Sequence, residues 1–228
     1  MPAPAELALK LNRFVEQALA TNKVLDINTH VTTNLGGRKK RVSWQASHPL
    51  NYLAYQLGTL DEYLYYLRSR HFSLVTFDGS IVQITFEIER GDLVGHRLNY
   101  VPCPIEFDPD LLELDSLDNV VEQVFVNQPR LEARLRASLR FDYDPAAAAA
   151  NHPASHCTLN YDSVRIPVQR HFDAHAFLNF VWNSFFIPRG VICPDDILVA
   201  PDGCDDVFDP LLRHKPHFGW SQQMTVAE

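Results

Sequence analysis

The densest group of side chains with chemical potential lies in RFDYDPAAAAANHPASHCTLNYDSVRIPV, residues 140–168. Imidazoles exchange protons near neutral pH, carboxylates orient imidazoles, and a guanidinium holds phosphate or carboxylate in a planar fork. This combination suits phosphate-ester chemistry. The residues concerned are Asp142, Asp144, His152, His156, Thr158 and Arg165.

The same side chains also have a purely structural interpretation. An aspartate after a strand caps a turn, and a histidine beside a proline fixes a loop through hydrogen bonds. Arg165 would then do no more than pair with Asp142 or Asp144. The concentration of these residues in one strand, connector and hairpin, rather than any single member, favours a functional site.

A second polar group lies between residues 78 and 100. Residues 78–80 form a typical hairpin turn, and Gln83 follows it. His96 and Arg97 are adjacent on a predicted strand, so their side chains leave opposite faces and only one of them can face a given pocket. An inward Arg97 needs an acidic partner, which we expect near Asp142.

The pattern His-x-Ser/Thr-apolar occurs twice, at residues 71–74 and 156–159, both on predicted strands. It is similar to the paired signature of the 2H phosphoesterases. In that family two strand-borne units face each other, the histidines act as general acid and base, and the hydroxyls hold phosphate oxygens. The resemblance covers the motif alone, because the chain lacks an internal repeat like that family's duplicated lobes.

Metal binding is a third hypothesis. His152 and His156 are four residues apart, as are His171 and His175, and two histidines at that spacing on a helix can share a cation. Pro153 makes the first pair loop-like, and no paired cysteine motif or HExxH sequence accompanies either pair. We therefore assign no residue as a metal ligand.

These side chains need elements that position them, and hydrophobic periodicity predicts most of those elements. Apolar residues at three- and four-residue spacing predict amphipathic helices over 5–19 and 49–70. Alternating β-branched and aromatic residues between turn formers predict a three-stranded antiparallel meander, with strands over 71–77, 81–90 and 93–101.

The middle of the chain continues with a short helix over 117–125 and a long strand over 130–144. The long strand alternates apolar with charged or polar residues, which is typical of a strand with one solvated face. Segments 155–160 and 164–168 are predicted to form a hairpin, with a proline near its end.

A strongly apolar helix is predicted over 174–186, capped at its start by Asp173. The segment 189–228 is rich in proline and aspartate, so we expect a loop-rich C-terminal segment. No linker divides the chain, and residues 1–228 are predicted to form a single domain. The predicted fold class is α+β: a mostly antiparallel sheet, meander plus hairpin, packed against N-terminal helices and one late apolar helix.

Composition limits the class of protein. The 228 residues are 46% hydrophobic and 21% charged, an ordinary globular balance. A formal net charge of -8 disfavours non-specific binding to a phosphate backbone, and the basic run 38–41 is expected to be a solvated loop. We find no membrane span, export signal or paired cysteine spacing, which favours the reducing cytoplasm.

Six sequence blocks occur in order: FDGSIVQITFE, HRLNYVPCPI, RFDYDP, HPASHCTLN, VRIPV and FFIP. Together they resemble an uncharacterised bacterial protein family, domain-of-unknown-function family twenty-two-ninety, over roughly residues 72–188. The resemblance implies an intracellular prokaryotic protein and brings no known activity. The residues that match the family's polar signature are Asp78, Gln83, His96, Arg97, Asp142, His152, Ser155, His156 and Arg165, whereas His71, His171 and His175 lie outside it.

Our leading functional hypothesis is a protein that recognises, and hydrolyses or transfers, a phosphate-bearing nucleotide or nucleic-acid end. The alternative is a non-catalytic protein-interaction subunit whose polar residues form a structural hydrogen-bond network. The sequence identifies no cofactor and favours no membrane partner. The predicted catalytic residues are His96, His152, His156 and Asp142, and the predicted substrate-binding residues are Arg97, Arg165, Thr158 and Gln83, all in one pocket.

Overall fold

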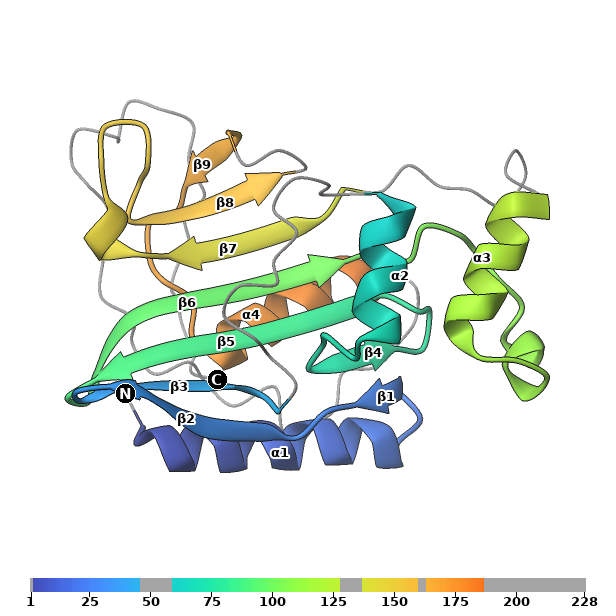
Figure 1. The fold of residues 1–228 in the computed structure, drawn as a ribbon, viewed down its shortest axis with the longest axis horizontal. Coiled ribbons are helices and arrows are strands. Elements are labelled where there is room, and N and C mark those ends of the chain that lie inside the picture. Colours follow the sequence, from blue (N-terminus) through green and yellow to red (C-terminus); the bar gives the residue numbers. More distant parts are fainter. Residues whose placement is uncertain (1, 46–58, 128–136, 160–162, 187–228) are drawn as a thin grey trace, which may run out of the picture.

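The structure is a computed structural model that describes residues 2–45, 59–127, 137–159 and 163–186. Within these ranges a nine-stranded antiparallel sheet is covered by helices on both faces (Figure 1). Helices α1 (Pro4–Ala20) and α4 (Ala174–Val181) share one apolar core with the sheet, and α2 (Leu60–Arg68) belongs to a second core. The predicted α+β class is confirmed.

The strands follow an almost continuous antiparallel path. Their order is β1-β4-β5-β6-β7-β8-β9, while β3 pairs with β5 beyond the end of β4, and β2 pairs with β3. The strands are β1 (Val24–Ile27), β2 (His30–Gly36), β3 (Lys39–Trp44), β4 (Leu74–Thr76), β5 (Ile81–Glu89), β6 (Asp92–Val101), β7 (Leu139–Tyr143), β8 (Ser155–Leu159) and β9 (Arg165–Pro167).

The main core lies between the sheet and helices α1 and α4. Alternate residues of the central strands, such as Leu98 and Phe141, point into it and are at most 2% exposed. Val15 of α1 and Phe177 of α4 are fully buried against them. The opposite faces of these same strands therefore carry the residues that α1 and α4 do not cover.

The second core lies around α2 and the segment that follows β6. It joins α2 to α3 (Leu117–Asn127), whose Val121 is fully buried, and the 3-10 turn η1 (Pro109–Glu113) contacts α3. Arg68 at the end of α2 bonds the carboxylates of Asp118 and Glu122 on α3. None of the described helices has the length and apolar character that crossing a bilayer requires.

Most predicted elements are confirmed within the described residues. The helix over 5–19 is α1, the meander is β4-β5-β6, the helix over 117–125 is α3, and the late hairpin is β8-β9. Asp173 caps α4 by accepting a hydrogen bond from Ala176 N, and a π-helical turn continues to residue 186.

Four expectations need correction or stay open. The strand expected over 71–77 begins only at Leu74, so His71 precedes it. Of the helix expected over 49–70, the described part is helical at 60–68. Of the strand expected over 130–144, the described part is strand at 139–143, while residues 137–138 lie outside any strand. Residues 46–58, 128–136 and 187–228, including the expected C-terminal loop segment, lie outside the described residues.

The expected solvated loop at 38–41 is wrong, and strands β1 to β3 were not predicted. Lys39 and Arg41 lie on β3, and both form ion pairs with Glu87 on the neighbouring β5. The opposite charge across the strand pair neutralises a run that would otherwise disfavour a strand. Of these four residues only Arg38 lies in the turn, together with Gly37, whose φ is 58°.

Candidate functional site

One face of the sheet carries the polar side chains that the sequence singled out. Arg97, Asp142 and His156 lie directly opposite one another on β6, β7 and β8. A second row lies two residues away on the same face of these strands, and it extends to β5 and β9. It runs from Gln83 on β5 through Asn99, Arg140 and Thr158 to Arg165 on β9, each opposite the next. We call the set Gln83, Arg97, Asn99, Arg140, Asp142, His156, Thr158 and Arg165 the polar face.

Asp142 is the central carboxylate of the polar face. Its Oδ1 accepts a hydrogen bond from Arg97 Nε at 2.8 Å and its Oδ2 accepts one from Arg140 Nε at 2.7 Å. Burial alone would raise the pKa of Asp142, but the charges and hydrogen bonds of the two arginines outweigh it and hold this pKa below its ordinary value. Asp142 is therefore ionised at neutral pH and can only accept hydrogen bonds.

The expected acidic partner for Arg97 is thus confirmed as Asp142. The arginine side chain is 36% exposed and the carboxylate side chain only 9%, so the pair lies at the boundary between solvent and interior. Arg140 is buried on the other side of the carboxylate. The arrangement fixes the direction of both guanidinium groups.

His156 presents an unprotonated nitrogen toward this cluster. Its Nδ1 lies 2.8 Å from the carbonyl oxygen of Pro153 and must donate to it. Its Nε2 lies 3.7 Å from Asp142 Oδ2, too far for a hydrogen bond. Burial lowers the pKa of His156 below its ordinary value, the nearby Asp142 partly opposes this, and the charge of Arg165 adds to it. The ring is neutral at pH 7, and Nε2 can accept a proton.

His152 lies beside His156, although it is outside the strands. The two ring centroids are 4.8 Å apart at an interplanar angle of 57°, and His152 Nδ1 bonds the carbonyl oxygen of Ala147 at 2.8 Å. The same turn is held by Asp144, which accepts a hydrogen bond from Ala147 N. The structure thus brings together His152 and His156, as the sequence predicted.

Three polar atoms on the polar face are buried and have no hydrogen-bond partner among the described residues: the acceptor Asn99 Oδ1, and the donors Thr158 Oγ1 and Arg165 Nε. Thr158 and Arg165 lie opposite each other on β8 and β9. Among the described residues Arg165 forms no ion pair with Asp142 or Asp144, so the simple structural role considered for it is not observed. Buried donors without partners are rare enough to need an explanation.

Two of the predicted site residues have other environments. His96 lies on the opposite face of β6, where its Nε2 accepts a hydrogen bond from Phe172 N at 3.1 Å, and burial lowers its pKa to about 3. Its predicted place in one pocket with Arg97 is wrong, because side chains alternate along a strand. Gln83 lies on the polar face, but its amide donates to His71 O at 2.6 Å and accepts from Asn99 Nδ2 at 3.0 Å.

The two His-x-Ser/Thr units do not face each other on strands. One lies on β8 and the other precedes β4, with β5, β6 and β7 between those strands. Ser73 Oγ is fully buried and bonds both His30 Nε2, at 2.9 Å, and Ile84 N, at 3.0 Å. The hydroxyl of the first unit is therefore committed to the fold, which contradicts the 2H arrangement.

The described residues contain no group of three or more histidine, cysteine, aspartate or glutamate side chains placed to hold a metal ion. His175 Nε2 instead lies 2.9 Å from Asn179 Nδ2 within α4. Sequence reasoning missed two members of the polar face, Asn99 and Arg140. Arg140 was open to prediction, because it stands two residues before Asp142 on an alternating strand.

Comparison with known proteins places the chain in a family. The family model described as "Uncharacterized conserved protein (DUF2290)" matches residues 24–220, and so covers most of the chain and every strand within the described residues. Searches of curated proteins and of solved structures gave no significant match. The expected family resemblance is confirmed, and it extends beyond the blocks at 72–188. The chain belongs to the DUF2290 family of uncharacterized conserved proteins.

Proposed function

We propose that the protein binds a phosphate-bearing nucleotide or nucleic-acid end at the polar face, with Arg165 and Thr158 as its contacts to the phosphate. The observation that carries this proposal is that Arg165 Nε and Thr158 Oγ1, on adjacent strands, are both buried and have no hydrogen-bond partner in the part of the chain that the structure describes. Leaving such donors unmet costs free energy, and a phosphate supplies several acceptor oxygens in one group. A bound phosphate would satisfy both atoms at once.

His156 gives the same site a proton acceptor. Its Nδ1 is held by the carbonyl oxygen of Pro153, so the neutral ring carries its lone pair on Nε2. In hydrolysis, Nε2 would take a proton from water as that water attacks the phosphorus, the ester P–O bond would break, and the imidazolium would return the proton to the leaving oxygen. Asp142, 3.7 Å away, would stabilise the resulting imidazolium, which makes it a positioning residue rather than a proton donor.

The binding proposal is tested by calorimetric titration with nucleoside monophosphates and short oligonucleotides carrying a terminal phosphate. Charge-assisted hydrogen bonds contribute about 1.5–3 kcal/mol, so Arg165→Ala should weaken binding by roughly tenfold to a hundredfold. Thr158→Val removes one hydrogen bond from an uncharged hydroxyl to the charged phosphate and should weaken binding by about tenfold or more. The matched control is Arg38→Ala, which removes a positive charge from an exposed turn and should leave affinity unchanged.

Circular dichroism and thermal melting of each variant establish that the fold is retained. The unphosphorylated nucleoside serves as the ligand control. Equal binding of nucleoside and nucleotide, or unchanged nucleotide affinity in Arg165→Ala, would contradict the proposal.

A second candidate is a non-catalytic interaction subunit in which the polar face is a structural network. The observation that favours it is the double contact of Asp142 with Arg97 and Arg140, which ties β6 to β7. The chain of contacts from Asn99 through Gln83 to the carbonyl oxygen of His71 extends the network to β5 and the segment before β4. Thermal-shift screening separates the two functions, because only a ligand site predicts a nucleotide that raises Tm in the wild type but not in Arg165→Ala.

A further inference from the structure

The outer edge of the sheet beside β3 is formed by β2, whose backbone groups alternate between β3 and the outside. Gln45 N donates to Thr29 O at 3.1 Å, and these two residues lie opposite each other in the register of β2 and β3. In an antiparallel pair hydrogen-bonded and non-hydrogen-bonded residues alternate. The N–H and C=O groups of His30, Thr32 and Asn34 therefore point away from β3.

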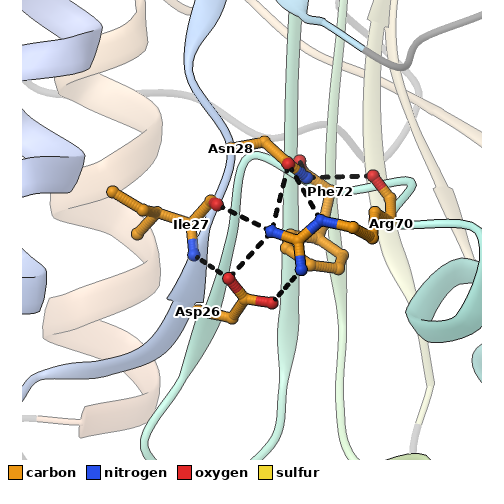
Figure 2. A network of polar contacts seen from close by, with 5 residues as sticks. All are labelled: Asp26, Ile27, Asn28, Arg70 and Phe72. Carbon is orange, nitrogen blue, oxygen red and sulfur yellow. Dashed lines mark hydrogen bonds and ion pairs between the residues drawn. The ribbon is translucent and has the colours of Figure 1, made fainter.

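Side chains cap the neighbouring positions along this edge. The side-chain amide of Asn12 on α1 bonds both outward backbone groups of His30, in place of a neighbouring strand. Its Oδ1 accepts a hydrogen bond from His30 N at 2.6 Å, and its Nδ2 donates one to His30 O at 3.0 Å. On β1, Ile27 N donates to Asp26 Oδ1 at 2.8 Å, and Arg70 Nη2 donates to Ile27 O at 3.0 Å (Figure 2). At these positions no backbone group remains for another strand.

The caps stop where β2 becomes exposed. Thr32 and Asn34 are exposed, and no other described residue forms a hydrogen bond with their outward backbone groups. Their strand, HVTTNLG, contains neither a formally charged residue nor a proline. A strand edge in this state accepts another strand, and natural proteins usually protect such edges with charge or proline.

We propose that this edge pairs with the same edge of a second copy of the chain. In an antiparallel pair centred on Thr33, Thr32 lies opposite the partner subunit's Asn34, and Asn34 lies opposite the partner subunit's Thr32. Each of these two pairs exchanges two backbone hydrogen bonds, so every open group of both copies is satisfied. A register shifted by one pair in one direction would need the backbone groups of His30, which already bond Asn12. A shift in the other direction would extend the pairing past the irregularity between Asn34 and Gly36.

The chemistry of the edge suits a second copy. The β2 side chains carry no formal charge, so two copies meet there without like-charge repulsion despite the net charge of -8 on each chain. The open stretch is short, so the contact area is small and the dimer is weak and concentration-dependent. The two sheets join into one continuous sheet with the polar faces at its far ends, because β2 and β9 lie at opposite ends of the strand order.

Thr33 provides a charge-swap test, because the two-fold axis places this residue opposite itself. Sedimentation velocity over a wide concentration range should show reversible dimerisation of the wild type. Thr33→Lys and Thr33→Glu should each weaken it, while an equimolar mixture of the two variants should associate about tenfold more tightly than either alone. A hetero-partner or a different surface would not produce this recovery.

Thr32→Pro is the second variant. It removes an outward N–H from each copy and leaves the β2–β3 hydrogen bonds in place, so the fold should be retained while dimerisation is lost. A wild type that stays monomeric at every concentration would overturn the proposal. It would equally be overturned by a dimer that persists in Thr32→Pro, or by a mixture of the Thr33 variants that associates no better than its components.

Discussion

Asp142→Asn is the substitution that most sharply tests the electrostatics of the polar face. Removing one partner of a buried ion pair costs about 3–5 kcal/mol, because the remaining charge is left without compensation. Arg140 is the more buried of the two arginines that bond Asp142, because its side chain is 10% exposed, so most of the cost comes from its lost contact. The Arg97 side chain is 36% exposed, so water replaces most of what it loses, and that contact contributes only about 0–1 kcal/mol.

Asparagine keeps the volume of the side chain and still accepts one hydrogen bond, so we expect a loss of about 2–4 kcal/mol in the free energy of unfolding. Urea unfolding followed by tryptophan fluorescence at pH 7 measures it. Asp26→Asn is the matched control, because Asp26 also bonds an arginine, Arg70, but through side chains that are 40% and 51% exposed. That exposed pair should cost about 0–1 kcal/mol.

The pH dependence of the free energy of unfolding gives a second test of the same substitution. The pKa of Asp142 is lower in the folded chain than its ordinary 3.8, so the unfolded chain binds the proton first. The stabilisation is complete above about pH 4 and is lost as the pH falls below that value. Asp142→Asn should lack this part of the acid sensitivity. A loss no larger than that of Asp26→Asn, or unchanged acid sensitivity, would refute the reasoning.

Three other substitutions test the account of the fold. Burial lowers the pKa of His30 to about 4, so the unfolded chain binds a proton more readily than the native chain between pH 6.5 and 4. The free energy of unfolding should therefore fall by roughly 3 kcal/mol across this window. His30→Gln should flatten that part of the pH profile of the unfolding free energy. Gly79→Ala should cost about 1–3 kcal/mol more than Gly91→Ala by urea unfolding, because both glycines have positive φ but only at Gly79 would a Cβ meet three side-chain atoms at 3.0–3.2 Å. Phe177→Ala should cost about 3–5 kcal/mol in the same assay, and a loss under about 1 kcal/mol would contradict its place in the core.

The sequence predicted the elements whose hydrophobic period is strong. The helix α1 and the meander β4-β5-β6 were recovered because their apolar residues repeat with the period of one buried face. The hairpin β2-β3 was missed because β2 is largely exposed and β3 is held partly by the ion pairs of Lys39 and Arg41 with Glu87. Such cross-strand charge pairs involve residues 46 or more positions apart and leave no local pattern.

The candidate site was predicted in part for a similar reason. Strand alternation alone separates His96 from Arg97, so placing both in one pocket conflicted with a rule already known from sequence. The pairing of Arg97 with Asp142 followed from the cost of an unpaired buried charge. The contact of Arg140 with the same carboxylate, and the orphaned state of Thr158 and Arg165, depend on the register of β7, β8 and β9, which the sequence does not specify.

The most direct test of the central claim observes the Nε–H proton of Arg165. This signal can be assigned by its loss in Arg165→Lys and followed by two-dimensional NMR during titration with a nucleoside monophosphate. We predict a saturable shift of the Arg165 Nε–H signal, with the signal of Arg38 in its exposed turn unchanged. An Arg165 signal that stays in place to about ten millimolar ligand, well beyond the range of specific affinities, would contradict a phosphate site on the polar face.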